Sequence, residues 1–567
     1  MSADAANFRT PPETPSGDDD SAPRVLRRTT QSEPMANRAT RGFAWLMLQT
    51  FATKFVGLGS EVILAWLLFK EDYGVRSNVM SIFLFANVLQ EAGINHVLIN
   101  RQHKLARWAN AAFWASIAIG LAGALVLALI APWVAVGYRT PQLLGMILVL
   151  ALRSPINALG TVSYAKLQIQ LRYKALAIIG FIVVCVTAIS SIFFASHGFH
   201  AYSFVWPLLI AAIVRSSILW WVAPVKLHWK LQIRRWKYLT TQSVLSLMAV
   251  FFLMITSQGD YMTLGRVYSS RIGQATVIGI YYFAFNLCLQ TTQFLTNNLA
   301  NVLLPTFGKL QYEPERLKRA FLRATRLLAI FGVFACLLQA AVAAPMIQTL
   351  FRPKDDPDKW VPAVPVLQVI SLAMAMQLFN MPAMSLIQAQ GRFRAMLKLS
   401  VIFAAVFMGI VIACGYMGTG AEGRIWCEPL KHFLEAIFRQ PVWLDAGMKS
   451  VKGDSLNVTI VIAIGVAAYN AVVGPICLYV AIQPLGGTWR EIWPIYVWPV
   501  VTSAVAILVG MEVGHQLPRT QASNWIKLFL VPTISVLVYA PLVRLTAAGA
   551  WHDFMARIQG LWKRTPQ

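Results

Sequence analysis

One stretch of the chain, from Tyr281 to Pro305, carries side chains whose type and spacing suit a hydrogen-bonding surface. It is apolar apart from regularly spaced amides: Asn286, Gln290, Gln293, Asn297 and Asn301. At about 100° per residue, these five amides fall within an arc of roughly 80° on a helix. So long and apolar a helix indicates a membrane span, in which an amide faces either a partner helix or a wet cavity. Five amides in register favour a cavity wall over simple hydrogen bonding between helices.

Ionisable side chains within other apolar segments form a second set of candidates. They are Lys54, Glu61, Glu91, Arg153, Arg215 and Asp260. Charges at this depth are costly, so we expect them to face the interior of a helix bundle. Arg215 lies near enough to a span end to extend to the membrane surface. For the others two interpretations stay open: ligand contacts, or internal ion pairs that join Lys54 or Arg153 to Glu61 or Glu91.

Together these groups suit a ligand with an anionic end and a hydroxyl-rich end, such as a pyrophosphate-linked sugar chain. Lys54 and Arg153 are predicted to hold the pyrophosphate, and the five amides to bind the sugars. A carrier without an ATP site needs an ion gradient or the membrane potential, and intramembrane carboxylates commonly provide the coupling. We therefore expect Glu61, Glu91 and Asp260 to take part in ion coupling, with a helix-end cap as the alternative role of Asp260.

Other chemistries find little support in the sequence. No phosphate-binding loop ending in Gly-Lys-Ser/Thr is present, and the six cysteines have no metal-ligand spacing. The fingerprint-like run 418–423 follows an apolar segment rather than a strand, and the acidic run 355–358 stands in a short loop without a catalytic domain. We expect no enzymatic activity, no metal and no cofactor. A disulfide between Cys414 and Cys427 remains an open alternative to free thiols.

The composition is that of a membrane protein. Of the 567 residues 57% are hydrophobic and only 13% charged, and the mean hydropathy is +0.57. This excludes an ordinary soluble domain and predicts an all-α protein with many spans. The net charge of +25 would suggest nucleic acid as the partner of a soluble protein. Here the enrichment of basic residues in cytoplasmic loops explains it, so no nucleic acid partner is expected.

Hydropathy predicts about fourteen transmembrane helices. The apolar segments are 43–69, 76–100, 109–134, 141–163, 175–195, 200–223, 239–264, 276–304, 322–351, 362–389, 396–416, 456–482, 492–512 and 525–549. Basic residues cluster in the tails and in the loops that follow even-numbered spans, for example in 226–237 and 309–326. An even number of spans with this bias places both termini in the cytoplasm.

Three segments outside the spans have their own character. Residues 1–40 are rich in Pro, Ser, Thr, Asp and Arg and are predicted to be a disordered cytoplasmic tail. The connection 417–455 is the longest, and Leu430, Phe433, Leu434 and Ile437 recur in it at helical spacing. Residues 550–567 show a similar pattern. We expect both to contain amphipathic helices on the membrane surface.

An internal repeat predicts two halves of equal topology. Arg172-Tyr173-Lys174-Ala175 follows span 4, and Arg392-Phe393-Arg394-Ala395 follows span 10. Six spans separate the two sites, which predicts parallel halves related by a pseudo-twofold axis along the membrane normal. The predicted organisation is an N-lobe (41–225, spans 1–6), a C-lobe (238–482, spans 7–12) and two additional C-terminal helices (492–549).

Four short motifs resemble those of a known family. They are 65–74, which ends in Asp72-Tyr73-Gly74 between spans 1 and 2; 89–94, with Glu91 before Gly93 near the end of span 2; 260–265 followed by 278–281; and 302–305, which ends in Pro305, together with 391–393. Their order and spacing are similar to those of the polysaccharide and lipid-linked oligosaccharide flippases of the multidrug/oligosaccharidyl-lipid/polysaccharide exporter superfamily. The likeness covers residues 40–415 and 456–510, whereas the 417–455 insertion departs from the family pattern.

This resemblance implies a carrier in the bacterial inner membrane. It would move undecaprenyl-pyrophosphate-linked repeat units of an exopolysaccharide or O-antigen to the periplasmic leaflet by alternating access. Its partners would be the lipid-linked substrate, membrane lipids, and the polymerase and chain-length proteins of the same pathway. Two rivals remain: an ion-coupled drug efflux antiporter of the same superfamily, and a membrane polymerase or glycosyltransferase. The amides and mid-span cations favour the flippase.

Overall fold

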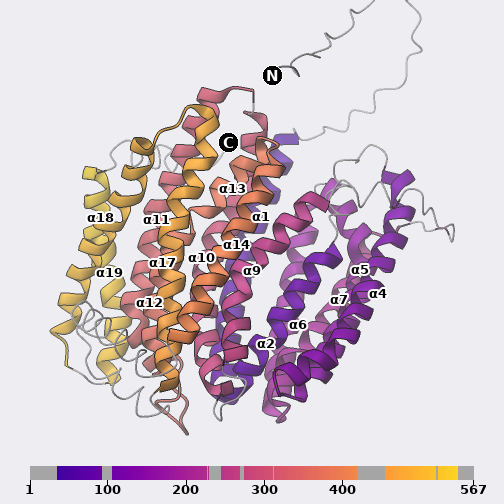
Figure 1. The fold of residues 1–567 in the computed structure, drawn as a ribbon, viewed down its shortest axis with the longest axis horizontal. Coiled ribbons are helices and arrows are strands. Elements are labelled where there is room, and N and C mark those ends of the chain that lie inside the picture. Colours follow the sequence, from indigo (N-terminus) through magenta and orange to yellow (C-terminus); the bar gives the residue numbers. More distant parts are fainter. Residues whose placement is uncertain are drawn as a thin grey trace, which may run out of the picture.

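The protein is a bundle of long helices, as expected for an all-α membrane protein (Figure 1). The computed structural model describes residues 35–91, 105–170, 172–225, 228, 236, 244–267, 274–310, 312–417, 454–518 and 521–546. The helices are α1 (Met35–Leu67), α2 (Lys70–Glu91), α4 (Leu105–Gly137), α5 (Gln142–Ile169), α6 (Tyr173–Ser196), η2 (His200–Phe204), α7 (Trp206–Val222), α9 (Val244–Val267), α10 (Gln274–Lys309), α11 (Pro314–Leu350), α12 (Ala363–Gln377), α13 (Asn380–Ala389), α14 (Phe393–Met417), α17 (Asp454–Ile482), η3 (Gln483–Leu485), α18 (Trp489–His515) and α19 (Gln521–Thr546).

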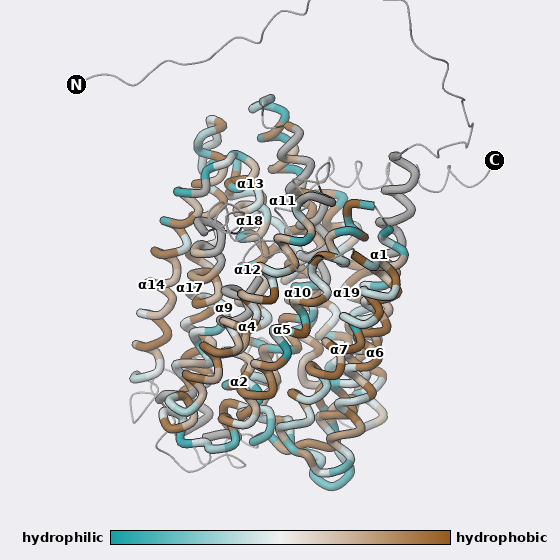
Figure 2. Tube along the Cα trace, turned by 90° about the vertical axis from the view of Figure 1, so that its right-hand side faces the viewer, coloured by the Kyte–Doolittle hydropathy of each residue, from teal (hydrophilic) through white to brown (hydrophobic). Residues whose placement is uncertain are grey.

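Eleven helical segments among the described residues are long and apolar enough to cross a membrane. Helices α2, α9 and α10 occupy three further predicted span positions but are not among these eleven. A polytopic membrane protein is therefore confirmed, while the count of fourteen spans stays a prediction. Hydrophobic residues dominate the length of the helices, and hydrophilic ones gather mainly at the two ends of the bundle (Figure 2).

The helices pack in two sets that meet at α2. Helices α4, α5, α6 and α7 pack among themselves and α1 packs on α6, whereas α9, α10, α12, α14 and α17 pack among themselves. The principal contact between the sets is α2, which lies against both α9 and α10. The additional helices α18 and α19 pack on each other and on α11. The lobe boundaries at 41–225 and 238–482 stay a prediction.

The two repeat motifs form matching turns. The backbone N–H of Arg172 donates to the Leu167 carbonyl at 3.0 Å, and that of Arg392 donates to the Ile387 carbonyl at 3.2 Å. Each bond spans five residues, and each turn ends one helix (α5 or α13) and begins the next (α6 or α14). The similarity of sequence at these two places thus extends to their backbone hydrogen bonding.

Some predicted boundaries differ from the structure. Helix α1 begins at Met35, so the predicted 1–40 tail is too long by several residues, because apolar patterning begins only after this polar first turn. The predicted span 362–389 consists of two helices, α12 and α13, that meet at Leu378 and Phe379.

The predicted amphipathic segments in 417–455 and 550–567 lie almost wholly outside the described residues. Cys427 also lies outside them. Cys414 is a free cysteine.

Candidate functional site

The amide stripe lies on α10, which is a single helix from Gln274 to Lys309 as predicted. Asn286 and Gln290 are half-buried, and Gln293 is exposed. The side chains of Asn297 and Asn301 lie outside the described residues. Helix α10 contacts α2, where the two sets meet, and also α9, α11, α12, α13 and α17. Partial exposure on so enclosed a helix supports a wall that water or a ligand reaches.

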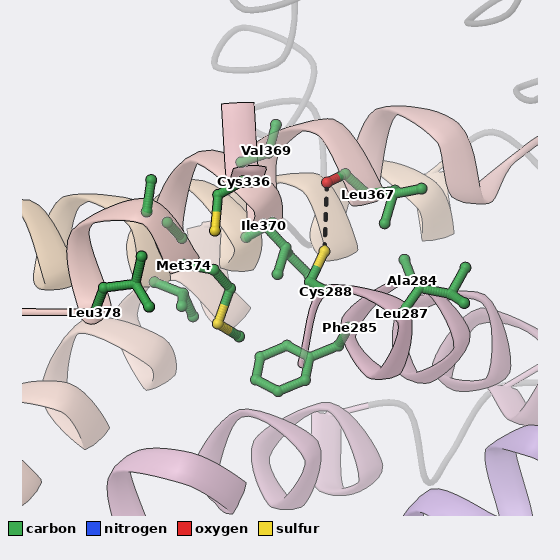
Figure 3. Close-up of a cluster of buried hydrophobic side chains, with 14 of the residues drawn as sticks. Ala284, Phe285, Leu287, Cys288, Cys336, Leu367, Val369, Ile370, Met374 and Leu378 are labelled. Atoms are coloured by element: carbon green, nitrogen blue, oxygen red, sulfur yellow. Dashed lines mark hydrogen bonds between the residues drawn. The ribbon is translucent and has the colours of Figure 1, made fainter. Parts of the chain in front are cut away.

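The opposite side of α10 is buried against neighbouring helices. Ala284 and Cys288 lie about 160–200° around the helix from Asn286, and both are fully buried. They pack with Leu287 against the α12 residues around Leu367, and the Cys288 thiol donates to the Leu367 carbonyl at 3.6 Å (Figure 3). The described amides of the stripe therefore lie on the side of α10 opposite to the one that packs against α12.

Asp260 is held inside the bundle rather than at a helix end. It is 1% exposed and lies seven residues before the end of α9 at Val267. Its Oδ2 accepts a hydrogen bond of 2.8 Å from the Tyr281 hydroxyl of α10, and the Tyr261 ring packs edge-on against that of Tyr281. In the described part of the chain no cation lies within ion-pair distance of Asp260. A buried carboxylate without a cation is suited to hold a proton or a small cation.

Glu61 forms an ion pair with Arg76, a residue that the sequence analysis did not single out. The distance from Arg76 Nη1 to Glu61 Oε1 is 3.1 Å, and Glu61 is only 6% exposed. The guanidinium also lies 4.1 Å from the centre of the Phe204 ring. The partner of Glu61 is thus Arg76, not Lys54 or Arg153. Arg76 was missed because it is the first residue of the predicted span 76–100, whereas α2 begins at Lys70.

The two predicted phosphate-binding cations stand on different helices of the first set. Lys54 is half-buried on α1 and Arg153 half-buried on α5, and both helices contact α6. The Arg153 guanidinium lies 4.9 Å from the centre of the Phe83 ring of α2. Lys54 has no carboxylate within ion-pair distance among the described residues, so its charge is available to an anionic ligand. The Glu91 side chain lies outside the described residues.

The described residues contain no cluster of three or more His, Cys, Asp or Glu side chains placed to hold a metal. The groups that the structure does bring together are carboxylates with one hydroxyl or one guanidinium, and amides on one helix face. This arrangement can bind hydroxyls and anions and can exchange a proton or a cation.

Comparison with known proteins gives one family match and several relatives. The model of a family described as "Polysaccharide biosynthesis protein" matches residues 63–365, more than half of the chain. The succinoglycan biosynthesis transport protein ExoT of Rhizobium meliloti (strain 1021) is 25% identical, over 69% of this chain and 77% of its own. The lipopolysaccharide biosynthesis protein WzxC of Escherichia coli (strain K12) is 22% identical over the same shares.

Solved structures share the fold. The chain is similar to the lipid II flippase MurJ in an inward closed conformation, with a TM-score of 0.60, 14% identity, and coverage of 88% of this chain and 98% of that one. It is also similar to an inward-facing multidrug resistance transporter of the MATE family, with a TM-score of 0.56, 14% identity, and coverage of 76% and 95%. At these identities the likeness shows the fold alone.

Proposed function

The chain belongs to the polysaccharide biosynthesis protein family, and from this premise we propose that it carries lipid-linked oligosaccharide repeat units across a bacterial inner membrane. The cargo is an undecaprenyl-pyrophosphate-linked unit of an exopolysaccharide or O-antigen, moved from the cytoplasmic to the periplasmic leaflet by alternating access. Both termini are cytoplasmic in this proposal. The transport roles named for the relatives ExoT and MurJ support it.

The amide face of α10 is the observation that carries this proposal. Asn286, Gln290 and Gln293 share one side of a helix whose other side is packed against α12. Primary amides both donate and accept hydrogen bonds, which suits the hydroxyls of a sugar chain. A drug carrier would favour apolar and aromatic lining instead. Asn297 and Asn301 extend the same face toward Pro305 in this proposal.

Lys54 and Arg153 bind the pyrophosphate in this proposal. A guanidinium matches phosphate oxygens with paired hydrogen bonds, and an ammonium acts as a point charge. Burying either charge costs roughly 2.5–3.5 kcal/mol on insertion scales. An anionic ligand offsets that cost whenever it is bound.

Asp260 is the leading coupling carboxylate in this proposal, with Glu91 and the Arg76-paired Glu61 as further members of the set. Asp260 contacts α10 through Tyr281. A proton or cation bound at Asp260 therefore alters a hydrogen bond to the helix that binds the cargo. The carrier needs no enzyme activity and no cofactor of its own. The polymerase and chain-length proteins of the same pathway are its proposed partners.

Loss of the amide face provides the test. Gln290→Leu combined with Gln293→Leu removes two described amides and keeps the helix apolar. We expect surface polymer to fall at least tenfold while lipid-linked repeat units accumulate in the membrane. Thr291→Val is the matched control, because Thr291 lies on α10 away from the stripe. Normal polymer export by the double variant would contradict the proposal.

A further inference from the structure

The turn between α1 and α2, residues 68–69, is contacted by connections that are distant in sequence. The Phe69 ring stacks on that of His200, the first residue of η2, with 5.9 Å between ring centres. Beside the turn, the Thr276 hydroxyl at the start of α10 donates to Glu71. Lys359, between α11 and α12, donates to the Leu68 carbonyl. We call the end of the bundle that carries these connections the outer end, because the basic residues predict that it faces the periplasm.

Lys359 binds the C-terminal end of α1. Its Nζ donates to the carbonyls of Ala65, at 3.1 Å, and Leu68. The last carbonyls of a helix lack hydrogen-bond partners within the helix, so the N–H groups of the Lys359 amine satisfy them. Lys359 is only 7% exposed. Among the described residues no carboxylate lies within ion-pair distance of it, so its bonds here are to backbone carbonyls.

Trp360 adds a second hydrogen-bond donor and a large buried ring. Its Nε1–H donates to the Ala65 carbonyl at 3.0 Å. Its fully buried ring stacks on Phe283 of α10, with 4.0 Å between centres, and meets Tyr73 of α2 edge-on at 5.0 Å. One side chain therefore touches α1, α2 and α10 together.

The attachment is reciprocal. Trp66 of α1 donates through Nε1–H to the Leu350 carbonyl, the last residue of α11, at 3.0 Å. Each of the two helix ends thus receives an indole donor from the neighbourhood of the other. At the same end Gly279 of α10 lies so close to the Lys70 carbonyl that a Cβ there would overlap it.

We infer that Lys359 and Trp360 form a latch that holds the outer end closed, and that they must leave the α1 carbonyls for the cargo to exit. They are positioning residues that act through α1 and need not touch cargo. The latch spans the predicted lobes, because α1 belongs to one and the α11–α12 connection to the other. Release replaces protein hydrogen bonds by bonds to water, and a freed ammonium is well hydrated, so the contact can open and reform. This inference rests on the proposed alternating-access transport.

A buried cysteine at the junction reports opening without reference to cargo. Ser81 of α2 is 1% exposed and donates to Gln258 Oε1 of α9 at 3.2 Å. Ser81→Cys is labelled in spheroplasts with a membrane-impermeant maleimide added outside, and the signal of the same protein without Ser81→Cys is subtracted. Lys359→Met and Trp360→Phe are compared with Lys354→Met, which removes an exposed lysine from the same connection. Trp360→Phe keeps an aromatic ring and removes the N–H.

We expect each latch variant to raise the labelling rate at least threefold and Lys354→Met to leave it unchanged. Ser400→Cys on α14, also fully buried, detects general loosening and should not change. Rates equal to those of Lys354→Met, or an equal rise at Ser400→Cys, would overturn the latch. If Lys359→Met does not accumulate in the membrane, the labelling rate in Trp360→Phe alone tests the latch. Failure of the proposed cargo would leave these rates unaffected, so the two proposals fail separately.

Discussion

The Tyr281 hydroxyl donates a 2.8 Å hydrogen bond to Oδ2 of Asp260, and this bond joins α9 to the helix that carries the amide stripe. Both residues are essentially fully buried. Breaking this bond would leave a buried acceptor without its donor, at a cost of about 1–3 kcal/mol. A change of charge at Asp260 therefore acts on α10 through Tyr281. This link gives a physical route from ion binding to cargo binding.

The first prediction concerns coupling. Asp260→Asn keeps the shape of the side chain but cannot ionise, so transport in reconstituted vesicles should persist while its stimulation by a proton or sodium gradient disappears. Glu91→Gln is measured beside it as the second candidate. Comparison of uptake with and without an imposed gradient checks both. Parental stimulation in both variants would mean that neither carboxylate couples transport.

The second prediction concerns the cations. Lys54→Gln and Arg153→Gln each remove a charge proposed to bind pyrophosphate, so surface polymer should fall at least tenfold with the protein still present in the membrane. Arg215→Gln is the matched control, because Arg215 is a half-buried cation of the same helix set whose guanidinium lies 5.1 Å from the Tyr164 ring. Normal export by the Lys54, Arg153 double variant would leave these charges a structural role alone.

The third prediction concerns topology. A reporter active only in the periplasm should be silent when fused after residue 567 and active when inserted at Gly447. The reason is the charge bias of the loops, which places both tails in the cytoplasm. Activity at both sites would contradict the prediction of fourteen spans, which places three spans between Gly447 and the C-terminus.

The fourth prediction concerns the pH dependence of the latch. Burial lowers the pKa of the Lys359 amine from its ordinary value of 10.5; Asp356, Asp72 and Glu71 oppose this shift and Lys70 adds to it. A released amine is hydrated and regains the ordinary pKa. Between the lowered pKa and 10.5 the released form therefore binds more protons than the latched form, so raising the pH favours the latched form.

The measurement is the labelling rate of Ser81→Cys in an otherwise unchanged chain, divided by its rate in Lys359→Met. The reactivity of the reagent cancels in this ratio. We expect the ratio to fall between pH 7 and pH 9.5. A ratio that rises with pH would show that the protonated amine stabilises the closed outer end.

Sequence periodicity was sufficient to predict α10 and its polar face, because apolar and amide residues alternate there with a helical period. It did not predict the pair of Glu61 and Arg76, since the start of α2 was placed six residues too late and Arg76 was assigned to the membrane boundary. Lys359 gave no local signal either. Its partner Ala65 lies 294 residues away, and only tertiary packing brings them together.

Outward movement of a lipid-linked oligosaccharide can be measured in vesicles that contain the purified protein. A sugar-modifying enzyme added outside measures how fast the cargo reaches the outer leaflet. We expect modification at least tenfold faster than in protein-free vesicles, and loss of this increase in the Gln290→Leu, Gln293→Leu variant. Modification no faster than in protein-free vesicles, combined with gradient-driven uptake of a small cationic drug by the same preparation, would contradict the proposed function.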